Sequence, residues 1–157
     1  MRWVILVRDP VDRALSQYHM ERGRGDEVLP FWLALIAERW RLRGRLDDFS
    51  ARSALRHHSY RLRGDYASQL RQLYEVFPRD SVLLLRSSEL KAEPHLTMGR
   101  VTAFLGLEPM PEGLVYGRVF EGGYERWSSD SWKRRLLRFL WRRDYSSQKK
   151  IGLDWGW

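Results

Sequence analysis

A short apolar run followed at once by a helical pattern sets the fold of the first eighteen residues. The run, Val4 to Val7, consists of branched apolar residues and stops at Arg8. Asp9 is a good N-cap residue and Pro10 suits the first helical position, so a helix is expected to begin immediately. A buried strand that leads straight into a helix is the way α/β folds present a site for an anionic group. The sequence therefore predicts an anion site at this junction.

Three side chains near the junction are candidates for holding that anion. Arg8 stands at the carboxyl end of the strand, Ser16 lies two turns into the helix, and Arg13 is a third possible donor. An arginine and a hydroxyl directed at one point would form a phosphate clamp. The alternative is that Arg8 only closes the strand while Ser16 lies on a solvated helix face.

The segment RDPVDRALSQY, residues 8–18, resembles the 3′-phosphate-binding segment of sulfotransferases that use 3′-phosphoadenosine 5′-phosphosulfate (PAPS). In that family the first arginine and the serine eight positions later hold the 3′-phosphate of the nucleotide. The resemblance implies the same role for Arg8 and Ser16.

Further resemblances follow in the family's order along nearly the whole chain. They comprise residues 60–77, which resemble a family helix; residues 101–107, VTAFLGL; Gly122, Gly123 and Tyr124, where a glycine-containing loop of the family meets the nucleotide; and residues 151–157, IGLDWGW. The family often has a more basic sequence at the glycine loop, and Arg126 is expected to take the place of that charge. The resemblance thus implies nucleotide-binding roles for these four loop residues.

The resemblance implies an enzyme that transfers a sulfuryl group from PAPS, its co-substrate, to a hydroxyl or amine of an acceptor, here expected to be a carbohydrate. Family members begin with a strand, a loop that cradles the 5′-phosphosulfate as a P-loop does, and a catalytic base. No matching loop is found in these 157 residues. The whole chain, residues 1–157, is therefore expected to be a single sulfotransferase-like domain that corresponds to the C-terminal two-thirds of the family domain. Its catalytic residues are left unassigned.

Periodicity places strands at residues 2–7 and 81–85, separated by helices, which favours a parallel α/β arrangement. Together with the resemblance, which implies a P-loop-like sheet truncated at the N-terminus, the predicted fold class is a helix-rich α/β domain with a parallel sheet flanked by helices. A loop is expected over residues 108–130. Helices are expected over residues 10–23, 30–43, 46–55, 64–77, 94–105 and 131–151.

The absence of cysteine excludes disulfides, thiol catalysis and thiolate metal sites. Golgi members of the family commonly carry a disulfide, so a bacterial-type, cytoplasmic protein is expected. The longest uninterrupted apolar run, Phe31 to Ala37, has seven residues and is too short to span a membrane. His57 and His58 are adjacent candidates for catalysis, or else two half-exposed imidazoles at a helix end. No histidine has a carboxylate at metal-ligand spacing, so no metal is predicted.

The net charge of +8 is concentrated near the C-terminus, where residues 132–150 hold eight lysines or arginines and one acid, Asp144. Residues 132–143, WKRRLLRFLWRR, fit a core-packing helix with a basic edge. They also fit a helix that lies on an anionic membrane or a surface for a polyanion such as nucleic acid. A second functional hypothesis is therefore a non-catalytic basic domain that binds a polyanion or membrane surface through these residues. Nucleic acid is not the expected partner, and the oligomeric state is not predicted.

Overall fold

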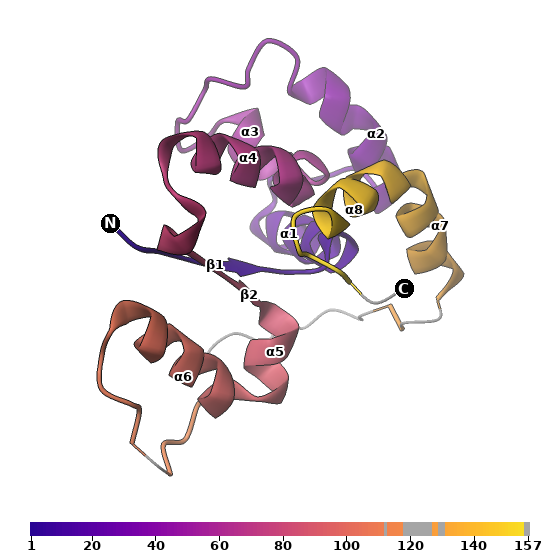
Figure 1. Cartoon of the computed structure of the whole chain (residues 1–157). Coiled ribbons are helices and arrows are strands. Elements are labelled where there is room, and N and C mark those ends of the chain that lie inside the picture. Colours follow the sequence, from indigo (N-terminus) through magenta and orange to yellow (C-terminus); the bar gives the residue numbers. More distant parts are fainter. Residues whose placement is uncertain (112, 118–126, 129–130, 156–157) are drawn as a thin grey trace. The chain divides into compact units, whose positions relative to one another are not determined.

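The computed structural model describes residues 1–111, 113–117, 127–128 and 131–155, and the chain divides into two compact units (Figure 1). Unit 1 consists of Met1–Arg8 and Ser68–Glu121. Unit 2 consists of Asp9–Ala67 and Gly122–Trp157. The boundary therefore falls between Arg8 and Asp9, directly before the first helix.

Unit 1 is built on a small parallel sheet. Its two strands lie side by side, with Trp3 opposite Val82 and Val7 opposite Arg86 (Figure 1). Helices α5 and α6 both contact β2. The elements are β1 (Trp3–Val7), α4 (Tyr66–Val76, which begins in unit 2), the 3-10 turn η2 (Arg79–Ser81), β2 (Val82–Arg86), α5 (Ser87–Ala92) and α6 (Pro94–Leu105).

Local sequence signals explain where the elements of unit 1 begin and end. Pro94 occupies the start of α6, where its missing N–H costs nothing. Gly106 ends the same helix with φ 71°, a left-handed conformation that glycine adopts without strain. At the start of β1, the rings of Trp3 and Phe77 meet edge to face with their centroids 5.2 Å apart. This contact fixes the start of β1 against the segment that follows α4.

Unit 2 is helical. Its elements are α1 (Pro10–Arg24), α2 (Phe31–Arg41), α3 (Ala54–His57), the 3-10 turn η1 (Leu62–Gly64), α7 (Trp132–Leu140) and α8 (Arg142–Lys149). The Asp9 carboxylate caps α1 by accepting the backbone N–H groups of Val11 and Asp12 at 3.0 and 3.1 Å. Gly25, with φ 83°, ends the helix.

The hydrophobic core of unit 2 forms around one face of α1. Residues at helical spacing on that face are buried, and apolar side chains from α2, α7 and α8 pack on them. The cluster comprises Val11, Ala14, Leu15, Tyr18, Phe31, Ala34, Tyr60, Leu137, Trp141 and Tyr145. Trp32 and Trp127 stack beside it with ring centroids 6.0 Å apart.

The predicted fold class is confirmed as a helix-rich α/β structure with a small parallel sheet. The helix expected over 46–55 is wrong, because only residues 54 and 55 of that range are helical. The Asp48 side chain accepts the N–H of Ser50 at 3.0 Å, a local bond that competes with a helix, and Ser53 caps α3 instead. The helix expected over 131–151 is divided at Trp141 into α7 and α8. Among the described residues, no helix is both long enough and apolar enough to cross a membrane.

Candidate nucleotide-binding site

The two residues predicted to hold a phosphate lie on either side of the boundary between the units. Arg8 follows β1 as the last residue of the first segment of unit 1, and its side chain is half-buried. Ser16 is also half-buried and lies in α1, within unit 2. Their joint role as a phosphate clamp stays a prediction.

The start of α1 is held by arginines from α7. Asp9 accepts hydrogen bonds from the Tyr145 hydroxyl at 3.2 Å and from Arg138 at 3.4 Å. Asp12, in the first turn, accepts a hydrogen bond from Arg134. Burial and the nearby Asp9 carboxylate raise the pKa of the Tyr145 hydroxyl well above its usual range, so it remains a donor. Both carboxylates at this helix start are therefore compensated by positive charge.

These contacts affect how an anion could bind here. The Asp9 carboxylate already accepts the first-turn N–H groups of Val11 and Asp12. An anion at this junction would therefore depend on side-chain donors more than on the backbone of the helix start. An arginine and a serine are suitable side chains for that purpose.

Arg13, the third candidate donor, has a structural role. Its guanidinium donates to the side-chain oxygen of Gln17 at 2.8 Å and to the backbone carbonyl oxygens of Ser59 and Tyr60. Gln17 in turn donates to the carbonyl oxygens of residues 56 and 57, each at 3.2 Å. The pair fixes the segment 56–60 on α1, which places Tyr60 in the core.

His57 belongs to a cluster of charged groups on unit 2. Its Nδ1 lies 2.8 Å from a carboxylate oxygen of Glu21 and 3.6 Å from one of Asp26. Its Nε2 lies 2.8 Å from the carbonyl oxygen of Ala51. The hydrogen bond to Glu21, followed by that to Ala51, raises the pKa of His57, which favours the imidazolium.

The potential ligand atoms of Glu21, Asp26 and His57 all lie within 4.8 Å of one another. Sequence spacing does not reveal this grouping, because His57 is far from the two carboxylates along the chain. Both nitrogens of His57 face hydrogen-bond acceptors, so a metal ion would have to displace a favoured proton. We therefore interpret the cluster as a structural ion pair and assign it no catalytic role.

His58 is in a different electrostatic environment from its neighbour. Its Nδ1 lies 3.2 Å from Arg41 and 3.5 Å from the buried carboxylate of Glu27. Burial, and secondarily the charge of Arg41, lowers the pKa of His58. The two adjacent histidines are thus parts of separate polar networks that hold α1, α2 and the 50–60 segment together.

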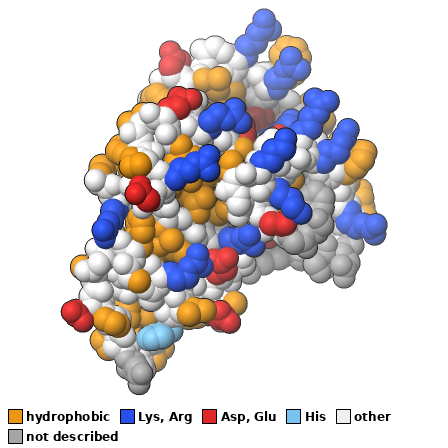
Figure 2. Space-filling view, in the orientation of Figure 1, with side chains coloured by type: hydrophobic (Ala, Val, Ile, Leu, Met, Phe, Trp, Pro, Cys, Tyr) orange, Lys and Arg blue, Asp and Glu red, His pale blue; other side chains and the backbone are white. Residues whose placement is uncertain are grey.

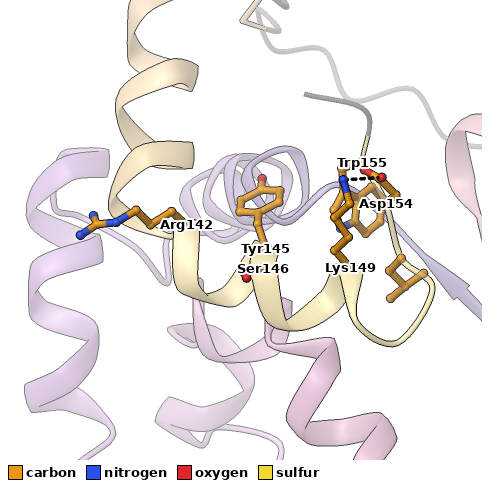
Figure 3. Close-up of a pocket in the computed structure, with 7 residues that line it drawn as sticks. Arg142, Tyr145, Ser146, Lys149, Asp154 and Trp155 are labelled. Atoms are coloured by element: carbon orange, nitrogen blue, oxygen red, sulfur yellow. Dashed lines mark ion pairs between the residues drawn. The ribbon is translucent and has the colours of Figure 1, made fainter.

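A small pocket beside α8 is shown in Figure 3, and it is lined by Arg142, Tyr145, Ser146, Lys149, Leu153, Asp154 and Trp155. Lys149 and Asp154 form an ion pair at 2.9 Å, and the side chain of Arg142 points away from the other labelled residues. The volume is about 180 Å³. Pockets for drug-sized ligands usually hold roughly 300–1,000 Å³, so this one is too small to enclose a nucleotide.

A larger groove of about 810 Å³ runs along the second half of α2. Its floor includes Glu38, which accepts the backbone N–H groups of Arg61 and Leu62 at 2.8 and 2.9 Å. Burial raises the pKa of Glu38. Arg61 and Asp144 form an ion pair at 2.8 Å on its wall. None of the predicted nucleotide-binding residues that the structure describes lines this groove.

Of the other residues predicted to lie near the nucleotide, the structure describes only some. Gly122, Gly123, Tyr124 and Arg126 lie outside the described residues. Tyr66, at the start of α4, is half-buried and its ring lies 6.3 Å from that of Trp155. Tyr66 is therefore part of the aromatic packing around the C-terminal segment.

Comparisons with known proteins place this chain, with its strand–helix junction and helix-rich α/β fold, among the transferases. The sequence model for the sulfotransferase domain matches residues 1–118, which include β1 and α1. The chain belongs to the sulfotransferase family, as the resemblance of its motifs implied.

A solved structure supports this assignment. The crystal structure of a sulfotransferase from Alicyclobacillus acidocaldarius superposes with a TM-score of 0.69 at 26% sequence identity. The match covers 98% of this chain and 55% of that protein, so the present chain spans about half of its length. No curated protein sequence matches this chain significantly.

Proposed function

We propose that this chain takes part in the transfer of a sulfuryl group from PAPS to a hydroxyl or amine of an acceptor, with a carbohydrate as the expected acceptor. In this proposal Arg8 and Ser16 hold the 3′-phosphate of the nucleotide. Gly122, Gly123, Tyr124 and Arg126 contact the same ligand. The observation that carries the proposal is the match to the sulfotransferase domain over residues 1–118, which contain Arg8 and Ser16.

In sulfuryl transfer the acceptor oxygen or nitrogen attacks the sulfur in line. The bond from sulfur to the 5′-phosphate oxygen breaks, 3′,5′-adenosine bisphosphate leaves, and a base takes the acceptor proton. Alignment and charge stabilisation dominate such reactions, by analogy with phosphoryl transfer. Binding of the 3′-phosphate would contribute to catalysis by holding the nucleotide, and so the sulfur of PAPS, at a fixed position. The base is assigned to no residue here, and the proposal includes no metal.

The electrostatics around α1 support this role for Ser16. Asp12 lies one turn before Ser16 on the same helix, so its negative charge would repel a phosphate at the serine. The guanidinium of Arg134 pairs with that carboxylate. Compensation by α7 thus removes the main local obstacle to an anion beside Ser16.

Arg8→Ala tests the proposal directly. Each hydrogen bond to a charged group contributes roughly 1.5–3 kcal/mol, so the affinity for 3′,5′-adenosine bisphosphate should fall about tenfold or more. Ser16→Ala should give a smaller loss in the same direction. Isothermal titration calorimetry measures both. The control is Arg71→Ala, which removes an exposed arginine of the same charge from α4 and should leave the affinity unchanged.

The 3′-phosphate itself provides a second comparison. Thermal unfolding of the wild-type chain should shift upward with 3′,5′-adenosine bisphosphate and much less with AMP. Equal shifts with the two nucleotides, or unchanged affinity in Arg8→Ala, would refute the assignment. The alternative hypothesis, a non-catalytic basic domain, predicts indifference to the 3′-phosphate.

The remaining expectations belong to the same proposal. In this proposal the chain is a single sulfotransferase-like domain of a bacterial type, located in the cytoplasm. These features follow from the resemblance and from the lack of cysteine. They stay predictions.

A further inference from the structure

Helix α7 buries some of its apolar residues and leaves others exposed. Leu137, and Trp141 at the helix end, are buried in the core of unit 2. Four other apolar side chains remain exposed: Trp132 by 65%, Leu136 by 39%, Phe139 by 61% and Leu140 by 54%. At 100° per residue these four form one stripe on the side of the helix that faces away from Arg134 and Arg138. Core packing therefore accounts for one face of α7 and leaves the other without an explanation.

Basic side chains border the exposed stripe. Arg135 is exposed on one side of it, and the guanidinium of Arg142 stacks on the ring of Phe139 at 4.7 Å from its centroid. Lys133 lies on the other side, with its amine 5.6 Å from the centre of the Trp127 ring. Helix α8 and the residue after it carry further exposed cations, namely Arg143, Lys149 and Lys150, of which Lys149 forms an ion pair with Asp154. In Figure 2, lysine and arginine side chains gather at the upper right, where α2, α7 and α8 lie in Figure 1, with hydrophobic side chains beside them.

Two arginines of the basic segment are not part of this surface. Arg134 is buried and pairs with Asp12, while Arg138 bonds to Asp9. The positive charge of α7 is thus divided: the inward arginines hold α1, and the outward cations surround the apolar stripe. This separation explains why the segment is more basic than its packing requires.

We propose that the outward face of α7 and α8 lies on an anionic membrane surface. The stripe, defined as Trp132, Leu136, Phe139 and Leu140, would enter the headgroup region, and the flanking cations would contact lipid phosphates. A polyanion such as nucleic acid would use the cations but would leave the four apolar side chains in water. A lipid surface can contact the apolar stripe and the flanking cations at the same time.

Flotation with lipid vesicles tests this proposal on the whole chain. Vesicles of phosphatidylcholine alone are compared with vesicles that contain about 30% phosphatidylglycerol, at about 0.1 M and about 0.5 M salt. We expect binding to the anionic vesicles, weaker binding to the neutral ones, and a residual apolar contribution at high salt. The double variant Phe139→Ser and Leu140→Ser should lower the partition coefficient about tenfold or more.

A matched control comes from α2. Leu33 and Ile36 are exposed apolar residues of another helix of unit 2, by 52% and 66%. Their double substitution by serine should leave vesicle binding unchanged. Circular dichroism confirms that each variant is folded. Replacing Arg135 and Arg143 with glutamine should reduce binding to the anionic vesicles only.

Three results would overturn the proposal. The first is absence of vesicle binding by the wild-type chain. The second is unchanged binding in the Phe139→Ser and Leu140→Ser variant, which would indicate attraction by charge alone, as for a polyanion. The third is a dimer in sedimentation that this variant converts to a monomer without any vesicle binding, which would show that a second copy covers the stripe.

Discussion

Glu27 is a buried carboxylate whose side chain has no exposed surface. It accepts hydrogen bonds from the backbone N–H of Leu29 at 2.9 Å, the hydroxyl of Tyr60 at 2.8 Å and the guanidinium of Arg41 at 3.1 Å. Burial alone would raise the pKa of this carboxyl, but the bonds from Arg41, Leu29 and Tyr60 outweigh burial and lower the pKa from 4.5 to about 2. The charged form of Glu27 therefore stabilises unit 2.

The lowered pKa of Glu27 predicts how the free energy of unfolding depends on pH. Because the pKa is depressed in the folded chain, the contribution is fully present above pH 4.5 and is lost as the pH falls from 4.5 to about 2. The free energy of unfolding should fall by about 3 kcal/mol over this pH range. Urea unfolding at pH 7, 5, 4 and 3, followed by circular dichroism, measures it. Glu27→Gln should be less stable at pH 7 and should flatten the acid slope, whereas Glu75→Gln, at an exposed site on α4, should leave both unchanged. Identical slopes in wild type and Glu27→Gln would contradict the assignment.

At the level of elements, one buried arginine connects α7 to the start of α1. Arg134 is 7% exposed, pairs with Asp12, and donates to the carbonyl oxygens of Trp127 and Ser128 at 3.0 and 3.2 Å. Its Nη1 also lies 3.7 Å from Asp9. Removing it leaves a partly buried carboxylate without its main partner.

Arg134→Met should therefore destabilise the chain by about 3 kcal/mol. The neighbouring Arg135→Met removes an equal charge from an exposed position and should change the free energy of unfolding by less than about 0.5 kcal/mol. Chemical denaturation measures both. Arg134→Lys, which keeps the charge, should fall between them. Equal effects of the two methionine variants would mean that Arg134 does not connect the helices.

Elements with strong local signals were predictable from the sequence. The order Asp9, Pro10 at the start of α1 and the pair Pro94 and Gly106 around α6 placed those helices within a residue or two. The strand at 82–86 followed from its apolar run. In each case the signal is a property of adjacent residues and does not depend on the rest of the chain.

Elements that depend on weaker signals were predicted less well. Helix α5 has only six residues, too few for an apolar period, although Glu89 bonds back to the N–H of Arg86 at 3.4 Å. No glycine or proline marks the position at Trp141 where α7 ends and α8 begins. On α2, Ile36 and Trp40 have helical spacing with the core residues but are 66% and 70% exposed. Periodicity identified that helix but did not separate its two apolar faces.

At the scale of the whole molecule, the family and the fold class followed from motif order, whereas the polar networks did not. The partners of Glu27 come from different elements, so no spacing in the sequence joins Arg41, Tyr60 and His58. The apolar stripe of α7 has the composition of a core face, and only the exposure of its side chains distinguishes it. Contacts that depend on the tertiary fold could therefore not be predicted from the sequence.

The two compact units differ in how their apolar residues are buried, and this difference predicts their local stability. The aromatic cluster lies entirely in unit 2. In the described part of unit 1 the sheet has two strands, and Val4 and Leu6 on one face of β1 are 41% and 51% exposed. A two-stranded sheet with an uncovered face contributes little stability by itself. The strands should therefore open without unfolding of unit 2.

Native-state hydrogen exchange measures this directly. The amides of residues 4–6 in β1 should exchange at least about tenfold faster than those of residues 14–18 in α1, because opening of the strands exposes less apolar surface than opening of the core. Low concentrations of urea should accelerate the α1 amides more steeply, since their exchange requires the larger unfolding. If both sets of amides share one rate and one urea dependence, the units unfold as a single cooperative domain. Faster exchange in β1 would show that this strand, which ends next to Arg8, belongs to the less stable part of the chain. Binding of 3′,5′-adenosine bisphosphate at Arg8 should then slow the exchange of the β1 amides.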